Sequence, residues 1–480
     1  MRRRTTTGIP ALTIFVAGII FSWAVSTTCG QTTSESIDHL MVTMANRGQF
    51  SGSVLVARHG RTIYENGFGR ADSINRIPFT PTTPCYLASL SKQFTAMAVM
   101  ILSDRHDLSY GDLLSKFFPE FPDYARRITI RHLLNHTSGI PDYVGLGLEH
   151  PGLTNGEVFR ALVNQDSLNF SPGDRFEYSN SGYILLALII EKVSGQPYRR
   201  FLKDHIFDPL GMKNTFVYDG SAPHAPGRAR AYNRFGDEDD YNLLTYGEGG
   251  IYSTVEDLFL WDRALYTEKL VKPSTLAEAF AGVKLHDGRV SNYGFGWGIG
   301  EFNNETTVSH AGRYGGFNTY IKRFPREQNT IVFLTNHDFK NMSAIGNALI
   351  NILYNHPYTL PRLSVAEYVY RVYNSEGIAE ALGRYHSLRQ KNDTTYDFSE
   401  SELNELGYQL LKAKKTNDAI EILKLNAQEY PASWNVYDGL GEAYMGNGNK
   451  ELAVHNYRKS LELNPENSNA GVMLKKLLRH

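Results

Sequence analysis

The stretch YLASLSKQFTAMAVMIL, residues 86–102, places a serine three positions ahead of a lysine and follows both with a long apolar run. Residues three apart on a helix share a face, so Ser89 and Lys92 are expected side by side where a buried helix begins. Burial lowers the pKa of an amine and lets it act as a base. The serine amide, which has no intrahelical partner there, is a candidate oxyanion donor. The alternative is a capping serine with a lysine that reaches solvent. This is the chain's only Ser-x-x-Lys, and its apolar helix favours burial.

A second polar group precedes another apolar helix, in FEYSNSGYILLALIIEKVSG, residues 176–195. A tyrosine hydroxyl near a lysine can relay a proton, which makes Tyr178 a candidate. An asparagine can hold a substrate carbonyl or fix the lysine, which makes Asn180 a candidate. The alternative is a loop tyrosine followed by an N-capping residue.

The third piece is TTVSHAGRYGGFNTYI, residues 306–321, in which two alternating segments meet at a glycine-rich turn. Gly312 would let a ligand backbone approach the strand closely. The amide of Arg313 is then a candidate second oxyanion donor, and the His310 and Arg313 side chains are candidates to meet a substrate carboxylate. A lone histidine at a strand end is usually structural. His310 is therefore a candidate only because the other two pieces are present in the same chain.

Taken in this order, the three pieces resemble the serine beta-lactamase and penicillin-binding protein superfamily. Within it, the chain is most similar to the class C beta-lactamase-like serine hydrolases, which include D-alanyl-D-alanine carboxypeptidases, D-aminopeptidases and esterases. The resemblance covers roughly residues 35–355 and extends to TIRHLLNHTSGIPDY (129–143), GEGGIYSTVEDLFLWDRAL (247–265) and YGFGWGIG (293–300).

The resemblance implies a role for each candidate. Ser89 would be the acylated nucleophile, and Lys92 its base or the partner of its base. Tyr178 would pass the proton to the leaving group and then activate water, and Asn180 would orient the substrate and the lysine. The amides of Ser89 and Arg313 would form the oxyanion hole.

One departure from the family pattern bears on the substrate. Efficient beta-lactamases of this family usually carry Lys-Thr-Gly where this chain has His310-Ala311-Gly312. Histidine is mostly neutral at pH 7, whereas lysine is a fixed positive charge. A peptidase or esterase is therefore favoured over a beta-lactamase proper.

Composition sets limits on the other function classes. The 480 residues carry a formal net charge of −1, which argues against nucleic-acid binding. The 15 histidines include no metal-ligand spacing, and no cofactor is implied. The chain begins with MRRR and continues with an apolar run and then small polar residues. This layout predicts a signal peptide over residues 1–30, and hence export to the periplasm or secretion. The alternative is a retained membrane anchor. Only Cys29 and Cys85 exist, so no disulfide framework is expected.

Periodicity predicts an α+β domain over residues 31–356. One helix and two strands come first, helices fill the middle, and three or four strands and a helix come last. This order indicates an antiparallel sheet built from both ends of the domain, flanked by helices and with an all-helical insertion. PGRARAYNRFGDEDDYN, residues 226–242, is expected to be an exposed, charged loop.

An internal repeat predicts an all-α segment at the C-terminal end. Leu406-Gly407 recurs 34 residues later as Leu440-Gly441, and Leu423 recurs as Tyr457, the period and residue types of tetratricopeptide repeats. We expect these repeats over residues 399–480, and a helical linker or degenerate repeat over 357–398. Their expected partner is a protein or peptide.

Three functions remain open from the sequence. The first is an exported serine hydrolase acting on D-amino-acid peptides of cell-wall type or on small esters. The second is a beta-lactamase proper. The third is a non-catalytic binding protein that uses the hydrolase scaffold and the repeats to dock a partner.

Overall fold

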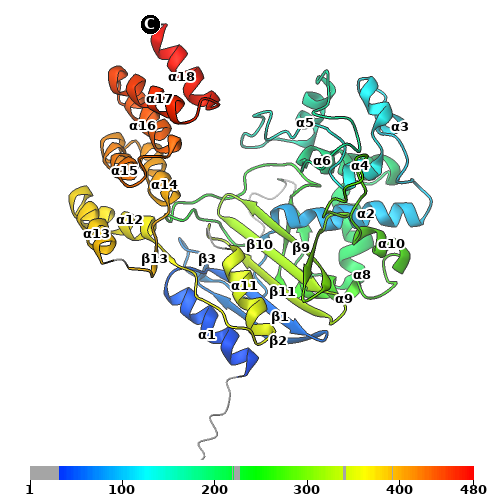
Figure 1. Cartoon of the computed structure of the whole chain (residues 1–480). Coiled ribbons are helices and arrows are strands. Elements are labelled where there is room, and N and C mark those ends of the chain that lie inside the picture. Colours follow the sequence, from blue (N-terminus) through cyan, green and yellow to red (C-terminus); the bar gives the residue numbers. More distant parts are fainter. Residues whose placement is uncertain (1–31, 219, 221–226, 339–341, 392, 480) are drawn as a thin grey trace, which may run out of the picture.

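The computed structural model describes residues 32–218, 220, 227–338, 342–391 and 393–479. The predicted signal peptide and Cys29 lie outside the described residues. Figure 1 shows a sheet with helices on both faces, a group of helices beside it and a column of C-terminal helices. No helix within the described ranges is both long enough and apolar enough to cross a membrane.

The central sheet joins the first and last strands of the predicted α+β domain. Its strand order is β2-β1-β11-β10-β9-β8, and all neighbours are antiparallel. Its strands are β1 (Gly52–Arg58), β2 (Arg61–Phe68), β8 (Gly298–Phe302), β9 (Glu305–Tyr314), β10 (Phe317–Phe324) and β11 (Asn329–Thr335). The pairing of β1 with β11 places Leu55 opposite Val332. The predicted fold class is thus confirmed.

Alternation along β1 gives the sheet two apolar faces. Val54 and Val56 belong to a buried cluster that includes residues of α1 and α11. Leu55 and Ala57 belong to a larger cluster that includes residues of α2 and α9. The helices concerned are α1 (Thr33–Asn46), α2 (Lys92–Asp104), α9 (Val255–Ala264) and α11 (Met342–Leu353). Helix α2, which follows Ser89, is therefore fixed against the sheet by its core packing.

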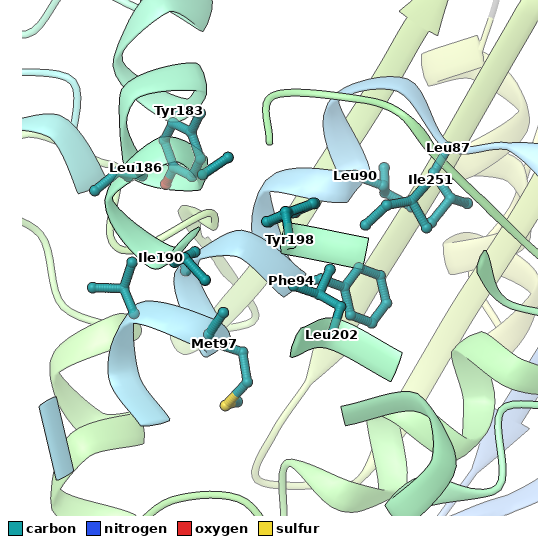
Figure 2. Close-up of a cluster of buried hydrophobic side chains, with 14 of the residues drawn as sticks. Leu87, Leu90, Phe94, Met97, Tyr183, Leu186, Ile190, Tyr198, Leu202 and Ile251 are labelled. Atoms are coloured by element: carbon teal, nitrogen blue, oxygen red, sulfur yellow. The ribbon is translucent and has the colours of Figure 1, made fainter. Parts of the chain in front are cut away.

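A helical insertion packs on the other side of α2. Phe94 and Met97 of α2 share the larger cluster with Leu186 and Ile190 of α6, as Figure 2 shows. The insertion contains α3 (Leu114–Phe117), η2 (Asp123–Arg127), α4 (Ile130–Leu134), α5 (Asn155–Val163), α6 (Asn180–Ser194), α7 (Tyr198–Leu202), η3 (Lys203–Phe207) and α8 (Asp208–Leu210), with α10 (Pro273–Ala279) after α9. The two helices that carry site residues, α2 and α6, thus pack directly on each other.

Short strands complete this part of the chain. β5 (Cys85–Tyr86), β7 (Ile251–Ser253) and β6 (Phe216–Val217) form one small sheet, and β3 (Arg70–Asp72) pairs with β4 (Ile77–Pro78). The β5–β7 pair joins the segment before Ser89 to the segment that follows Glu248.

Paired helices form the C-terminal column in Figure 1. They are α12 (Val365–Glu376), α13 (Ile378–Gln390), α14 (Glu400–Lys412), α15 (Thr416–Glu429), α16 (Trp434–Gly446), α17 (Lys450–Leu463) and α18 (Ser468–Leu478), with β12 (Leu363–Ser364) paired to β13 (Tyr396–Asp397). A Cβ at Gly407 would lie 2.5 Å from Leu423, and one at Gly441 would lie 2.8 Å from Tyr457. Glycine recurs because the paired helices touch there. The domain boundaries at 356 and 398 stay a prediction.

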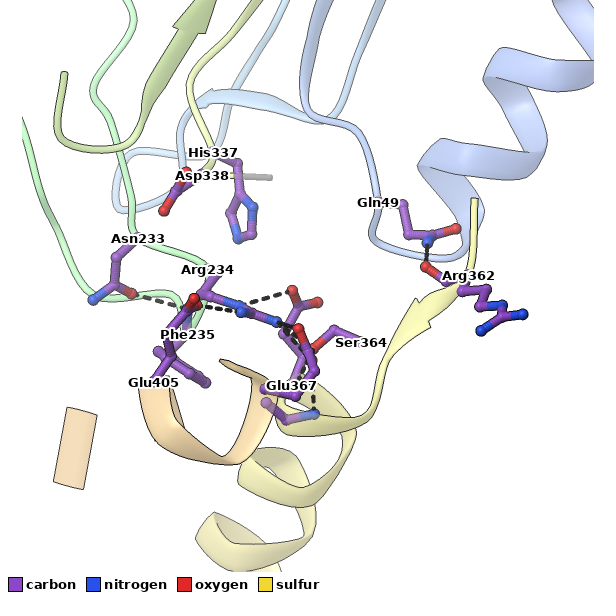
Figure 3. A network of polar contacts seen from close by, with 12 residues as sticks. Gln49, Asn233, Arg234, Phe235, His337, Asp338, Arg362, Ser364, Glu367 and Glu405 are labelled. Atoms are coloured by element: carbon purple, nitrogen blue, oxygen red, sulfur yellow. Dashed lines mark hydrogen bonds and ion pairs between the residues drawn. The ribbon is translucent and has the colours of Figure 1, made fainter. Parts of the chain in front are cut away.

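The loop over residues 227–242 is not the exposed excursion that its charge suggested. Arg234 is only 6 % exposed, and it joins the loop to the C-terminal helices. Its guanidinium donates two hydrogen bonds of 2.9 Å to Glu402, pairs with Glu405, and lies 3.5 Å from a carboxylate oxygen of Glu367 (Figure 3). The three carboxylates come from α12 and α14, far from the loop in sequence. We call this group the Arg234 cluster.

Candidate active site

Ser89 lies in a single 3-10 turn, Ala88–Ser91, and not in the first turn of the α-helix that the sequence suggested. Helix α2 begins only at Lys92. In a 3-10 turn, side chains three apart lie almost directly above one another, so Lys92 is brought over Ser89. Its Nζ donates to Ser89 Oγ at 3.1 Å. Ala88 has a left-handed backbone (φ +48°), an uncommon conformation for a residue with a side chain.

The Lys92 side chain is fully buried and has only neutral hydrogen-bond acceptors. Besides Ser89, its Nζ donates to Asn180 Oδ1 at 2.8 Å and to the main-chain carbonyl of Glu248 at 2.9 Å. Burial lowers the pKa of Lys92 to about 7, although the charges of Glu248 and Asp142 oppose the fall. At neutral pH, a large share of this amine is therefore unprotonated and free to accept a proton.

Asp142 holds Asn180 in the orientation that meets the lysine. Its Oδ2 accepts from both the backbone N–H and the Nδ2 of Asn180, each at 3.0 Å. With the amide nitrogen held in this way, the amide oxygen faces Lys92. Asp142 lies in the stretch TIRHLLNHTSGIPDY, but nothing in the sequence around it indicates this role.

The Tyr178 ring packs beside the buried amine of Lys92. Its ring centre lies 4.9 Å from Lys92 Nζ and 4.2 Å from the ring centre of His136. The phenol oxygen is buried and has no hydrogen-bond partner among the described residues. Burial raises the pKa of Tyr178 above its usual value, and the nearby Ser89 hydroxyl opposes the rise. The phenol therefore keeps its proton at neutral pH.

His136 positions the chain before α6. Its Nδ1 accepts a 3.1 Å hydrogen bond from the backbone N–H of Ser179, the residue between Tyr178 and Asn180. Burial lowers the pKa of His136 well below its usual range, so the ring is neutral and can accept this bond. Sequence reasoning missed His136, because nothing local links it to a residue 43 positions away.

Gly312 is approached closely by the Ser89 turn, and the close approach of a ligand that the sequence predicted there stays a prediction. A Cβ at position 312 would lie 2.2 Å from the Leu87 carbonyl and 3.1 Å from the Ser89 nitrogen. The hydroxyl of Thr319 on β10 donates to the same carbonyl at 2.8 Å. Glycine is required here because β9 packs directly on the backbone of the nucleophile turn.

His310 and Arg313 are both engaged by protein groups. The His310 ring nitrogens contact the Tyr293 hydroxyl at 2.8 Å and the Ala311 carbonyl at 2.7 Å. Burial lowers the pKa of His310 to about 3, so its ring carries no charge at neutral pH. The Arg313 guanidinium binds Asp338 at 3.0 Å. The substrate-carboxylate contacts predicted for both residues stay a prediction.

Ser89, Asn180 and Arg313 line one pocket of about 210 Å³, together with Tyr143, Glu248 and Tyr314. A larger hollow of about 420 Å³ lies among α13, β13 and Tyr430, but it contains none of the groups above. The smaller pocket is the candidate active site, because it alone of the two holds a hydroxyl beside a buried amine.

Comparison with known proteins gave consistent results. Residues 37–355 match the family described as Beta-lactamase, and residues 434–467 match the Tetratricopeptide repeat. Penicillin-binding protein 4* of Bacillus subtilis (strain 168) is 34 % identical over 355 residues, which cover 69 % of this chain and 78 % of that protein. The putative penicillin-binding protein PbpX of the same strain is 31 % identical over 312 residues, covering 63 % and 75 %. The solved octameric penicillin-binding protein homologue from Pyrococcus abyssi is 27 % identical, with a TM-score of 0.60, covering 71 % and 81 %.

Proposed function

The chain belongs to the beta-lactamase family and is a serine hydrolase, and from this premise we propose that it cleaves D-amino-acid peptides or small esters through an acyl-Ser89 intermediate. The observation that carries the proposal is the 3.1 Å contact between Ser89 Oγ and the buried Lys92 Nζ, whose pKa lies near 7. An amine with that pKa is well matched to general-base work at neutral pH.

In the first proposed step, neutral Lys92 takes the hydroxyl proton of Ser89 while Oγ attacks the substrate carbonyl. The carbonyl oxygen becomes an oxyanion, which the backbone N–H groups of Ser89 and Arg313 would stabilise. Asn180, fixed by Asp142, keeps the lysine in reach of Oγ and offers its amide to the substrate.

In the second step, the C–N or C–O bond breaks and the leaving group needs a proton. The Tyr178 phenol is protonated and buried beside Lys92, so it would donate that proton and recover one from the lysine. Water then attacks the acyl-Ser89 carbonyl with the same groups working in reverse. Because the lysine and tyrosine act as a coupled pair, the base is best regarded as the pair.

A beta-lactamase activity has less support than a peptidase or esterase activity. His310 stands where the family's efficient beta-lactamases carry a lysine, and it is neutral and bonded to protein atoms. A fixed positive charge for a beta-lactam carboxylate is therefore missing at that position. A beta-lactam would still acylate Ser89 slowly.

We further propose that the chain is exported and that its repeats dock a protein or peptide. The basic head and apolar run at the N-terminus support export. The tetratricopeptide match supports a partner, since such helical stacks present extended binding surfaces. Docking and hydrolysis are compatible in one chain, with the repeats localising the enzyme.

The proposal is tested by intact-mass analysis after exposure to a fluorophosphonate and, separately, to a beta-lactam. We expect one covalent adduct on the wild-type chain and none on Ser89→Ala. The neighbouring Ser91→Ala variant is the matched control and should still be labelled. Absence of an adduct with both reagents would favour the non-catalytic scaffold. Turnover of D-Ala-D-Ala peptides against nitrophenyl esters then separates the two substrate classes.

A further inference from the structure

We propose that the C-terminal helices position the backbone N–H of Arg313 through the loop over residues 227–242. Arg313 is the second oxyanion donor of the hydrolysis proposed above, on which this inference rests. The positioning residues are Asn233, Asp237 and Gln409, which lie outside the lining of the active-site pocket. Two sets of contacts support the proposal, one between the loop and the active-site strands and one between the loop and the helices.

The loop packs against the two-residue turn that joins β9 to β10, directly after the strand that contains Arg313. The N–H of Gly316 donates to the main-chain carbonyl of Asp239 at 2.9 Å. A Cβ at Gly315 would lie 2.3 Å from that carbonyl, and one at Gly316 would lie 2.2 Å from the Tyr232 carbonyl. Glycine is required at both turn positions because backbone meets backbone there. The position of the turn therefore depends on the position of the loop.

Tyr232 links the loop to Arg313 by a second route. Its carbonyl accepts a 3.1 Å hydrogen bond from the N–H of Asp338, and its N–H donates to the Asn336 carbonyl at 2.9 Å. The Asp338 carboxylate in turn binds the Arg313 guanidinium at 3.0 Å. The loop thus fixes both the main chain that follows Arg313 and the side chain of Arg313.

The end of the loop also supports the pocket wall. The Tyr241 ring stacks on Tyr86 with ring centres 4.0 Å apart, and its centre lies 5.2 Å from that of Tyr314. Asn242 accepts a 3.0 Å hydrogen bond from the Tyr314 hydroxyl. Because Tyr86 and Tyr314 line the pocket, a shift of the loop would move this wall together with the turn.

Within the loop, residues 232–239 form a short hairpin whose two ends have different partners. Tyr232 pairs with Glu238 in an antiparallel bridge, and the N–H of Asn233 donates to the Asp237 carbonyl at 2.8 Å. The base of the hairpin contacts the turn between β9 and β10. Its tip points to the C-terminal helices.

The hairpin tip contacts these helices through side chains. Gln409 of α14 donates a hydrogen bond to the Asp237 carboxylate and accepts one of 3.3 Å from Asn233. The ring centre of Phe235 lies 5.0 Å from that of Tyr370 on α12. The ion pairs of the neighbouring arginine add to these contacts (Figure 3). The tip is therefore held by two helices of the column.

A hydrogen-bonded hairpin transmits a displacement of its tip to its base. An oxyanion donor works only within about 3 Å of the developing charge, and a misplacement of about 1 Å can lower the rate about 10²-fold. That charge exists in the transition state and not in the bound substrate. Release of the tip should therefore lower kcat and leave KM nearly unchanged.

The test is Gln409→Glu, which places a second carboxylate against Asp237 and repels the hairpin tip from α14. With a nitrophenyl ester at pH 7, we expect kcat to fall about tenfold with little change in KM. Adding Asp237→Asn restores a donor opposite the new carboxylate and should recover most of kcat. Gln428→Glu, the same change at an exposed position of α15, should keep the wild-type kcat. An unchanged kcat in Gln409→Glu would overturn the inference, as would a loss that Asp237→Asn does not rescue or a change confined to KM.

Hydrogen exchange separates this inference from the proposed hydrolysis. Because the Gly316 N–H is bonded to the loop, the segment over residues 312–317 should exchange faster in Gln409→Glu than in wild type. The rescued double variant should exchange at the wild-type rate. This pattern supports the inference even where the wild-type chain turns over no substrate, in which case only the proposed hydrolysis fails. Equal exchange in wild type and Gln409→Glu overturns the inference whatever the activity.

Discussion

Lys92 and Arg234 are two of the buried cations among the described residues, and their surroundings differ in one respect. Lys92 is surrounded by a hydroxyl, an amide oxygen and a main-chain carbonyl, all of them neutral. Arg234 is surrounded by three carboxylates, those of Glu402, Glu405 and Glu367. The lysine lies beside the candidate nucleophile, whereas the arginine lies where the loop over residues 227–242 meets the C-terminal helices.

The two sites show that the desolvation of a buried cation can have opposite outcomes. Burial lowers the pKa of both cations. For Arg234 the three carboxylates outweigh this effect and raise its pKa, so the charge persists and the cluster holds two parts of the chain together. For Lys92 the effect of burial prevails, and the pKa falls to about 7. An uncompensated buried cation loses its proton readily, which a base requires and a structural link must avoid.

Loss of the lysine is expected to change the activity most. Lys92→Met should lower kcat/KM for a nitrophenyl ester about 10³-fold or more, since no amine remains to take the Ser89 proton. Lys92→Arg should be nearly as inactive, because a guanidinium keeps its charge and cannot act as a base. The melting temperature provides the second readout: Lys92→Met should be no less stable than wild type, since the substitution removes a buried amine that has no carboxylate among its hydrogen-bond partners.

A Lys92→Arg chain with more than a tenth of wild-type activity would show that the positive charge, and not the base, is what the site needs. A large fall in the melting temperature of Lys92→Met would show that the lysine stabilises the fold as Arg234 does.

The second prediction concerns Arg234→Met, which leaves three carboxylates without their cation. Removing one partner of a buried charged network typically costs about 3–5 kcal/mol. We expect that loss in urea unfolding and in hydrogen exchange of α14. The matched control is Arg384→Met, which breaks an exposed pair with Glu380 in α13 and should cost less than about 1 kcal/mol. Equal stability of the two variants would mean that the Arg234 cluster does not hold the loop to the helices.

The surroundings of Lys92 and Arg234 also differ in how well the sequence alone predicts them. Ser89, Lys92, Tyr178 and Asn180 were found because each stands at the start of a strongly apolar helix, a local signal. The six-stranded sheet followed from alternation at both ends of the domain. The repeat helices followed from a 34-residue period. These features follow from local patterns of residue types, and a single sequence is enough to show such patterns.

Residues whose partners are distant gave no such signal. Arg234 meets Glu402 across 168 positions, so its loop was expected to be solvated. Asp142 reaches Asn180 across 38 positions, and the Glu248 carbonyl reaches Lys92 across 156. A charged residue in a loop is exposed by default, and only its long-range partner makes burial tolerable. The missed residues are therefore those that tertiary contacts, and not local patterns, place in the site and the cluster.

The weakest of the predicted effects concerns Glu367, one carboxylate of the Arg234 cluster. Burial raises the pKa of Glu367 to about 7, although Arg234 opposes the rise, and repulsion from Glu402 adds to it. Because this pKa is raised above the unfolded value, the folded chain holds the proton more tightly. The resulting stability is fully present below about pH 4.5 and is lost as pH rises through 7. Between pH 6 and 8 we expect the free energy of unfolding to fall by about 1–2 kcal/mol more in wild type than in Glu367→Gln. Urea unfolding at the two pH values measures the difference. Parallel pH dependence in the two chains would mean that Arg234 keeps all three carboxylates ionised at neutral pH, and that its cluster carries no surplus of negative charge.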